Sequence, residues 1–194
     1  SGKVDAVVGL MAIVTTSSPL YNAELAMADA NTTKEIEITG WAPGTLGQVV
    51  ALHGRYYARD WGFGPYFEAK VAAGMARFIP RLDPDQDLFL AARRGAHLLG
   101  SITVDGSETE ANEAHIRWFI TSDAARGTGI GRRLMDQAMA FSDKVGFDLV
   151  YLDTFKGLDA ARHLYESHGF TLVSEHADTT WGVEVTEQRF ERRW

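Results

Sequence analysis

The chain of 194 residues contains no cysteine. Disulfides, thiolate metal sites and a cysteine nucleophile are therefore excluded, and we expect no metal site. The sequence also has no excess of basic residues, since 19 Lys and Arg stand against 26 Asp and Glu, which gives a net charge of -7. This charge disfavours a broad surface for nucleic acid, so we expect no nucleic-acid partner.

The sequence also offers no apolar run of the length that a membrane helix needs. Residues 4–14 are apolar apart from Asp5, but this run is about half of the ~20 residues that a spanning helix requires. Only Lys3 precedes the run and no convincing Ala-x-Ala pattern follows it, which disfavours a secretory signal. We therefore expect a cytoplasmic protein without a membrane partner.

The composition is typical of a folded protein, with 45% apolar and 23% charged residues. The length suits one well-cored domain. Residues 1–34 differ from the rest, because they are small and rich in Ala, Thr and Ser. We predict an N-terminal extension over 1–34, loosely packed or swapped onto a neighbour in a possible homodimer, and a single domain over 35–194.

Apolar spacing predicts strands and helices from residue 35 onward. The order is strand, two helices, three strands, helix, strand, helix and two strands, which predicts an α/β or α+β layer structure. Polar residues 105–112 are predicted to form a loop, and Gly169 to end the last helix as its left-handed cap. The predicted strands are 35–39, 87–92, 97–104, 114–120, 147–154, 170–174 and 183–190, and the predicted helices are 46–57, 67–78, 129–145 and 158–168.

Three glycines stand where a predicted strand leads into a helix, in the segment Arg126-Gly127-Thr128-Gly129-Ile130-Gly131. The first turn of a helix carries unpaired N–H groups and the positive end of the helix dipole, and glycine lets an anion approach the backbone closely. Arg126, with Arg132 or Arg133, can add charge-assisted bonds to phosphate. The segment therefore predicts a diphosphate site, although such a helix start can also lack any ligand.

Two other phosphate motifs do not fit this segment. A Walker loop needs Lys and then Ser or Thr after its last glycine, and here Arg132 and Arg133 follow Gly131. The dinucleotide fingerprint Gly-x-Gly-x-x-Gly needs a glycine where Arg132 stands. Nucleoside triphosphate hydrolysis and dinucleotide binding are therefore disfavoured.

The pattern Arg126-x-x-Gly129-x-Gly131 at a strand-to-helix junction resembles the acyl-CoA signature of the GNAT N-acetyltransferase superfamily. Residues 161–170 (ARHLYESHGF) resemble its second signature, Ala-x-x-Leu-Tyr-x-x-x-Gly-Phe. The resemblance covers about residues 35–194. Residues 53–62 and 66–69 are similar, more narrowly, to the acetyltransferase half of proteins that also carry a MarR-type DNA-binding domain.

The resemblance implies a mixed, mostly antiparallel central sheet of about six or seven strands with helices on both faces. It also implies acetyl-CoA as the cofactor, in a V-shaped opening between the strands at 114–121 and 147–154. The residues expected to bind this cofactor are Phe119, Ile120 and Thr121 along the pantetheine arm and Arg126, Gly127, Thr128, Gly129, Ile130, Gly131 and Arg132 at the diphosphate.

In this family an amine attacks the thioester directly, so the carbonyl must be polarised and the leaving thiolate must receive a proton. The resemblance assigns the first task to the backbone N–H near Phe119 and the second to Tyr165. Tyr165 also shares a helical face with Leu158, Ala161 and His168, so a purely structural role as a core aromatic is the alternative.

The general base is less sharply indicated. Glu113 is the first candidate, with Glu110 and Glu108, because they precede the strand where this family often keeps a carboxylate. The helices that wall the acceptor site offer further candidates for substrate binding, namely His53, Tyr56 and Glu68. Arg117 lies in mid-strand between apolar residues, and we predict that it points into the cleft and binds a substrate carboxylate.

These expectations indicate an acetyl-CoA-dependent N-acetyltransferase that acts on a primary amine, either in a small molecule or at a protein lysine or N-terminus. Two alternatives remain open at this point. The chain could transfer a different acyl group, or it could be a catalytically silent acyl-CoA-binding regulatory module.

Overall fold

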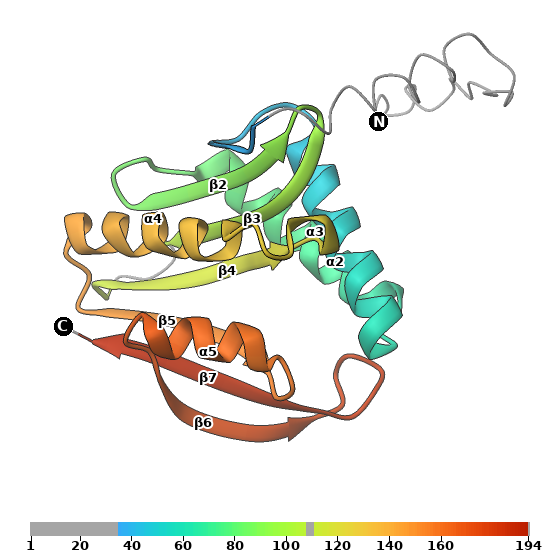
Figure 1. Ribbon diagram of the computed structural model, residues 1–194. Coiled ribbons are helices and arrows are strands. Elements are labelled where there is room, and N and C mark those ends of the chain that lie inside the picture. The colour runs from blue at the N-terminus through green and yellow to red at the C-terminus, as the bar shows by residue number, and fades with distance from the viewer. Residues whose placement is uncertain (1–34, 108–110, 194) are drawn as a thin grey trace, which may run out of the picture. The chain divides into compact units, whose positions relative to one another are not determined.

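The computed structural model describes residues 35–107 and 111–193 (Figure 1). The predicted extension over 1–34, with its apolar run, lies outside the described residues, as do Glu108 and Glu110. The described residues from Ile36 onward belong to one unit. Within them, no helix combines the length and the apolar character that crossing a bilayer requires.

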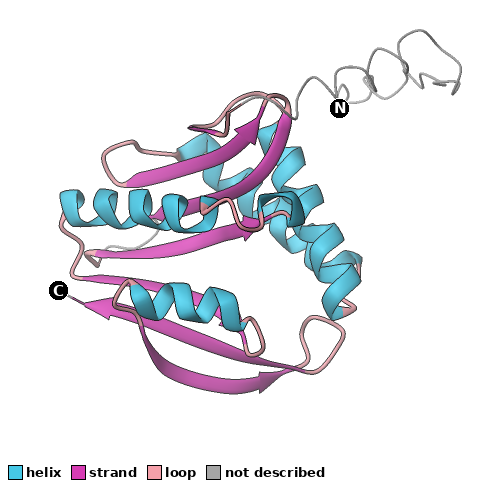
Figure 2. Cartoon of the chain, in the orientation of Figure 1, coloured by secondary structure: helices cyan, strands magenta, loops and turns pink. Residues whose placement is uncertain are grey.

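Seven strands form one sheet in the order β1-β2-β3-β4-β5-β7-β6 (Figure 2). Among the strands of the described residues, β4 and β5 pair in parallel and all other neighbours pair antiparallel. The predicted mostly antiparallel sheet is therefore confirmed. The strands are β1 (Glu37–Thr39), β2 (Asp87–Arg94), β3 (His97–Asp105), β4 (Glu113–Thr121), β5 (Leu149–Phe155), β6 (Thr171–Asp178) and β7 (Val185–Arg193).

Helices cover both faces of this sheet, as expected for the α/β fold. One face packs against α4 and α5 and the other against α2 and α3, because the buried side chains of the two helix pairs belong to separate core clusters (Figure 1). The helices are α2 (Thr45–Trp61), α3 (Pro65–Phe78), α4 (Ile130–Val145) and α5 (Asp159–Ser167), with short 3-10 turns η1 (Ile79–Arg81) and η2 (Asp123–Ala125).

Glycines in the left-handed conformation end the helices on both faces. Helix α2 continues past the predicted end to Trp61, since Tyr57 and Trp61 extend its apolar face, and it stops at Gly62 with φ 70°. Gly169, at φ 86°, follows α5 in the predicted left-handed conformation. Both residues need positive φ, which side chains other than glycine rarely tolerate.

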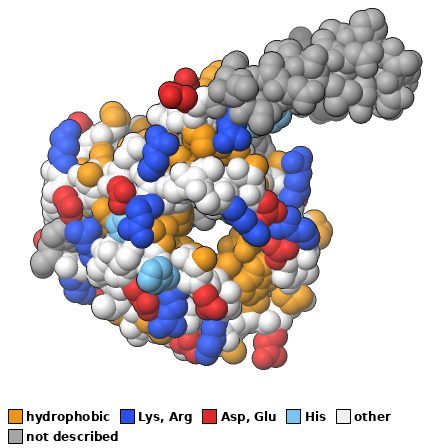
Figure 3. Space-filling view, in the orientation of Figure 1, with side chains coloured by type: hydrophobic (Ala, Val, Ile, Leu, Met, Phe, Trp, Pro, Cys, Tyr) orange, Lys and Arg blue, Asp and Glu red, His pale blue; other side chains and the backbone are white. Residues whose placement is uncertain are grey.

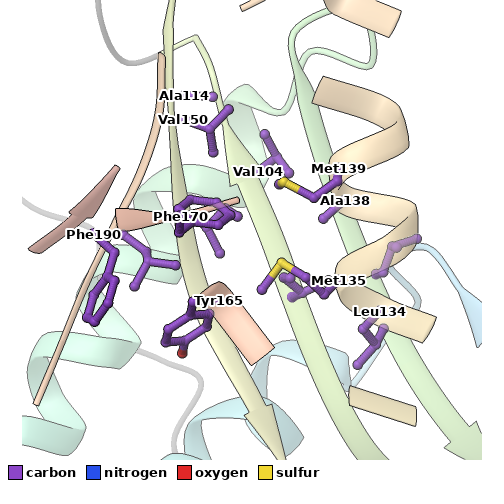
Figure 4. Close-up of a cluster of buried hydrophobic side chains, with 14 of the residues drawn as sticks. Val104, Ala114, Leu134, Met135, Ala138, Met139, Val150, Tyr165, Phe170 and Phe190 are labelled. Carbon is purple, nitrogen blue, oxygen red and sulfur yellow. The ribbon is translucent and has the colours of Figure 1, made fainter. Parts of the chain in front are cut away.

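The first core cluster fills the space between the sheet and α4 and α5 (Figure 4). From α4 it receives Leu134, Met135, Ala138 and Met139, all at most 4% exposed, at the helical spacing that the sequence predicts. The second cluster joins α2 and α3 to the opposite face and is rich in aromatic rings. The two cores fix the sheet between them and therefore position the residues at its centre.

One predicted loop residue is part of a buried ionic network. Asp105 was expected in the polar loop 105–112, but it ends β3 and is 1% exposed. Its carboxylate accepts hydrogen bonds from the guanidinium groups of Arg81 and Arg117. The prediction was wrong because polarity alone indicates solvent, whereas two cations make burial of a carboxylate favourable here.

Candidate active site

Strands β4 and β5 separate halfway along their length. Their parallel register runs from the pair Glu113–Leu149 to the pair Ile116–Leu152 and then stops. A cavity of about 860 Å³ opens at this point between the strands and the helices on both faces. Figure 3 shows a hollow with apolar side chains along its wall. Of the predicted site residues, the wall contains His53, Tyr56, Arg117, Phe119, Ile120, Thr121, Arg126, Gly131 and Tyr165.

The glycine turn, residues 126–131, has the geometry of an anion site at the start of α4. Gly127 and Gly129 are left-handed, at φ 73° and 72°, and a Cβ built on either would meet nothing within 4 Å. Gly129 is the N-cap residue and forms no side-chain cap, so the amides of Ile130, Gly131 and Arg132 have no partner within the helix. The turn therefore presents several N–H donors beside open space.

Three residues in or next to the turn, Thr128, Arg126 and Arg132, present less to the cavity than the sequence predicts. The Thr128 amide and hydroxyl both donate to the Ala125 carbonyl, at 3.2 and 2.6 Å, so they hold the turn together. Arg126 is largely exposed, and its guanidinium lies 2.8 Å from Asp123. Arg132 is exposed outside the cavity wall. The hydrogen-bond donors that this turn presents therefore come from the backbone more than from these side chains.

The last residues of β4 turn one amide toward the opening. The register between β3 and β4 shifts between Ser101 and Thr103, and Trp118 adopts a left-handed φ of 47°. The Trp118 carbonyl accepts a hydrogen bond of 2.8 Å from the Ser101 hydroxyl on β3. In a trans peptide the N–H points opposite to the C=O. The Phe119 amide therefore points away from β3, toward the gap between β4 and β5.

Tyr165 is both a core residue and a cavity residue. It is 6% exposed and packs near Phe170 and Phe190. Its hydroxyl points away from the apolar side chains of the first core (Figure 4) and hydrogen-bonds the Thr154 side chain at the end of β5. Burial raises the pKa of Tyr165 above its usual range, and the nearby Tyr56 adds to this effect. The hydroxyl therefore keeps its proton at neutral pH and can donate it.

Of the predicted carboxylates, the two that the structure describes, Glu113 and Glu68, lie outside the cavity wall. Glu113 begins β4, at the end where β4 and β5 are still paired, and lies outside the cavity wall. Glu68 is exposed on α3 and leans against Gly54 of α2. Both assignments came from position along the chain, which does not reveal the direction of a side chain.

His53 does line the cavity and has a defined tautomer. It is 5% exposed, and its Nδ1 lies 2.9 Å from the Val49 carbonyl. A carbonyl can only accept a hydrogen bond, so Nδ1 carries the proton and Nε2 has the lone pair. Burial lowers the pKa of His53 to about 4, which the bond to Val49 only partly opposes. The ring is therefore neutral at pH 7.

Arg117 reaches the cavity wall, but its charge already has a partner. Its Nη1 donates a hydrogen bond of 2.9 Å to Asp105, and its guanidinium lies 4.4 Å from the centre of the Trp118 ring. In the sequence alone, Arg117 has no evident partner in mid-strand. Asp105, twelve residues earlier, supplies the missing anion, and this leaves little reason to require a substrate carboxylate.

Many wall residues were not predicted from the sequence, and four of them carry polar groups that matter below, namely His115, Asp153, Trp181 and Glu187. His115 Nε2 lies 3.4 Å from Asp153, and burial together with Arg117 and Arg189 lowers the pKa of His115 to about 3. Burial raises the pKa of Asp153. A carboxylate within the apolar strand FDLVYLDT was a usable signal for Asp153, whereas Glu187 lies in a polar strand that offers none.

Solved structures share this fold. An acetyltransferase of the GNAT family from Staphylococcus aureus Mu50 is 13% identical, covers 82% of this chain and 99% of its own, and has a TM-score of 0.65. The ribosomal-protein-S18-alanine N-acetyltransferase from Escherichia coli is 16% identical, with coverage of 82% and 94% and a TM-score of 0.60. The paia N-acetyltransferase from Thermoplasma acidophilum, solved with coenzyme A, is 17% identical, with coverage of 82% and 99% and a TM-score of 0.60.

The family comparison agrees with these folds. No curated protein matches the chain in sequence. A family profile described as Acetyltransferase (GNAT) family matches residues 48–170, which is more than half of the chain and includes β4, the glycine turn and Tyr165. The chain belongs to the acetyltransferase (GNAT) family.

Proposed function

We propose that the chain is an N-acetyltransferase that transfers the acetyl group of acetyl-CoA directly to a primary amine. One observation carries this proposal: a single cavity joins the start of α4, the end of β4 and the hydroxyl of Tyr165. Anion-binding amides, a polarising amide and a proton donor therefore border the same space, which is what acyl transfer from a CoA thioester requires.

The family uses acetyl-CoA, and the residues of the glycine turn fit this cofactor. A diphosphate matches the amides of Ile130, Gly131 and Arg132, which lack helical partners, and the open space beside Gly127 and Gly129 admits it. Acetyl-CoA supplies the activated thioester. The free edge of β4 at Phe119, Ile120 and Thr121 is available to an extended pantetheine arm.

Groups of the chain itself polarise the carbonyl and transfer the protons. The Phe119 amide donates to the carbonyl oxygen as negative charge develops on it. As the new C–N bond forms and the C–S bond breaks, Tyr165 donates its proton to the sulfur. An acceptor that arrives as an ammonium loses two protons overall, one replacing the proton of Tyr165 and one leaving to solvent. We place the proton acceptor at His53, which lines the cavity, in preference to Glu113.

Two measurements test the proposal. Isothermal calorimetry with coenzyme A measures donor binding, and a thiol-release assay with acetyl-CoA and pooled amines measures transfer. Binding together with amine-dependent release supports the enzyme. Binding without release for any acyl donor favours a silent acyl-CoA-binding module. Release with propionyl-CoA or succinyl-CoA but not acetyl-CoA favours a different acyl specificity. Absence of coenzyme A binding would contradict the proposed enzyme and both alternatives.

Three narrower expectations stay proposals. These are the cytoplasmic location, a homodimer in which residues 1–34 take part, and the closer likeness to the acetyltransferase half of MarR-type fusion proteins. Gel filtration of the purified chain tests whether it forms a homodimer. The cavity wall gives further information on the acceptor, which is either a small molecule or a protein amine.

A further inference from the structure

The sheet divides the cavity wall into two halves. Ala114 and Ile116 of β4 pack into the first core, on the α4 and α5 side, so His115 and Arg117 point to the opposite face because side chains alternate along a strand. We call the part of the cavity on the α2 and α3 side the acceptor half. It faces away from Tyr165 and Gly131, which come from α5 and α4.

Two carboxylates line the acceptor half. Asp153 of β5 lies opposite Arg189 of β7, and Glu187 is two residues from Arg189, so Asp153 and Glu187 are diagonal neighbours on one face. Such neighbours are roughly 7–8 Å apart, a distance that a short aliphatic chain can span. The Glu187 carboxylate also accepts a hydrogen bond from Trp181 Nε1, which fixes it in the wall.

The cations on this face already have carboxylate partners. Arg189 Nη1 lies 3.9 Å from Asp153, but its Nε also donates to Glu191 at 3.1 Å, and His176 Nε2 lies 3.5 Å from Glu187. Arg117 and Arg81 both bind Asp105, whose side chain is fully buried, and Arg81 also lies 4.0 Å from the buried Asp87. Two guanidinium groups therefore face two carboxylates. A substrate carboxylate placed beside Arg117 would have to compete with Asp105 and would meet Asp153 and Glu187 across the cavity.

A histidine nitrogen in the cavity wall provides an independent indication of the ligand. His53 is 5% exposed and lines the cavity, and its Nδ1 is used by Val49. Within residues 35–107 and 111–193, its Nε2 has no hydrogen-bond partner, and this atom can only accept because the ring is neutral. An acceptor nitrogen in the cavity wall that no protein group uses fits a hydrogen-bond donor in the ligand.

The polar groups that the acceptor half offers are thus mainly hydrogen-bond acceptors, with excess negative charge. An ammonium group carries three donors, no acceptor and a positive charge, so it complements all of them. Trp181 and Tyr56 in the same wall are aromatic residues, a residue type that favours a nearby cation. Resting on the proposed N-acetyltransferase function, we propose that the acceptor is a cationic amine without a carboxylate, of the diamine or polyamine class, bound by Asp153 and Glu187.

The test compares three acceptors that share one five-carbon chain: diaminopentane, pentylamine and aminopentanoate. Thiol release gives kcat/KM for each with the full chain and acetyl-CoA. We expect diaminopentane to exceed aminopentanoate by at least about tenfold, with pentylamine between them. Asp153→Asn and Glu187→Gln should each lower kcat/KM for diaminopentane by about tenfold and change that for aminopentanoate little. The Gln side chain keeps an acceptor for Trp181.

The matched control is Glu184→Gln, which removes the same charge from an exposed residue outside the cavity wall and should leave the preference unchanged. A kcat/KM for aminopentanoate equal to or above that for diaminopentane would overturn the inference. So would Asp153→Asn and Glu187→Gln variants whose preference for diaminopentane stays within about twofold of the original. Calorimetry of diaminopentane with the CoA-saturated protein separates the two proposals. If no amine is acetylated but diaminopentane binds and Asp153→Asn abolishes this binding, the enzymatic function fails and the cation site stands.

Discussion

The Tyr165 hydroxyl lies at the border between the first core and the cavity. Its ring packs on Phe170 and Phe190, while its oxygen is held by Thr154. The two interpretations offered by the sequence, core aromatic and general acid, are therefore compatible, because one part of the side chain satisfies each. Substitutions that keep the ring and remove the oxygen distinguish packing from proton donation.

Tyr165→Phe keeps the buried ring and removes only the hydroxyl. We expect kcat to fall by about 10²-fold or more, the usual size of a general-acid contribution, while the affinity for coenzyme A stays close to that of the original chain. Thiol-release kinetics and calorimetry measure the two quantities. Phe119→Leu, which changes a neighbouring ring of the wall but keeps the backbone amide, is the control and should lower kcat less. A Tyr165→Phe enzyme with full kcat would remove Tyr165 from the chemistry.

His53 makes stability depend on pH. The unfolded imidazole binds a proton below its usual pKa of about 6.5, whereas burial keeps the folded ring neutral until about pH 4. Its contribution is therefore fully present above pH 6.5, is lost as the pH falls to 4 and changes no further below that. The loss over this window is on the order of 3 kcal/mol.

Urea unfolding at several pH values between about 7 and 4 measures this dependence. His53→Asn keeps a donor for the Val49 carbonyl and should reduce the slope of the unfolding free energy against pH, with His115 supplying a remaining part. His97→Asn removes an exposed imidazole from β3 and serves as the control. An unchanged slope in His53→Asn would show that His53 is not buried as a neutral ring.

At the scale of elements, a substitution at the start of α4 should affect coenzyme A binding and protein stability in different ways. A Cβ on Gly131 would lie 3.6 to 3.9 Å from Thr121, Leu164 and Phe119, which is ordinary contact, but it would stand in the cavity wall. We expect Gly131→Ala to keep or raise the melting temperature, because Ala favours a helix by up to about 1 kcal/mol over Gly. Calorimetry should show coenzyme A binding weakened by at least about tenfold.

Gly47→Ala is the matched substitution in α2. Gly47 is exposed, and a Cβ there meets nothing within 4 Å. Its helix gains the same intrinsic preference, but the change lies outside the cavity wall, so coenzyme A affinity should not move. Equal affinities of the two variants would place the diphosphate elsewhere than on the glycine turn.

The order of elements and the glycine turn could be predicted from the sequence because they depend on local information. Apolar spacing along α4, the glycines before it and Gly169 after α5 each act within a few residues. The acceptor half could not be predicted in this way. Strand register brings Arg117 next to Asp105 and His115 next to Asp153, and this register depends on the packing of the whole sheet.

At the scale of the whole molecule, both core clusters and the cavity wall are built from residues after Ile36, among those that the structure describes. We therefore expect a fragment of residues 35–194 to fold and to bind coenzyme A within about twofold of the full chain. Near-UV circular dichroism and calorimetry check this. A fragment that does not fold would show that residues 1–34 belong to the domain, and gel filtration of both forms shows whether they hold a dimer together.

The single parallel pairing among the described strands has a consequence for the molecule as a whole. β4 and β5 share a register of only four residue pairs, from Glu113–Leu149 to Ile116–Leu152, and diverge beyond it. The sheet is thus two antiparallel halves joined by a short seam. If the donor binds as proposed, its pantetheine arm would bond the end of β4 in place of the missing rungs, so the donor would act as a temporary eighth strand and brace the two halves during the reaction.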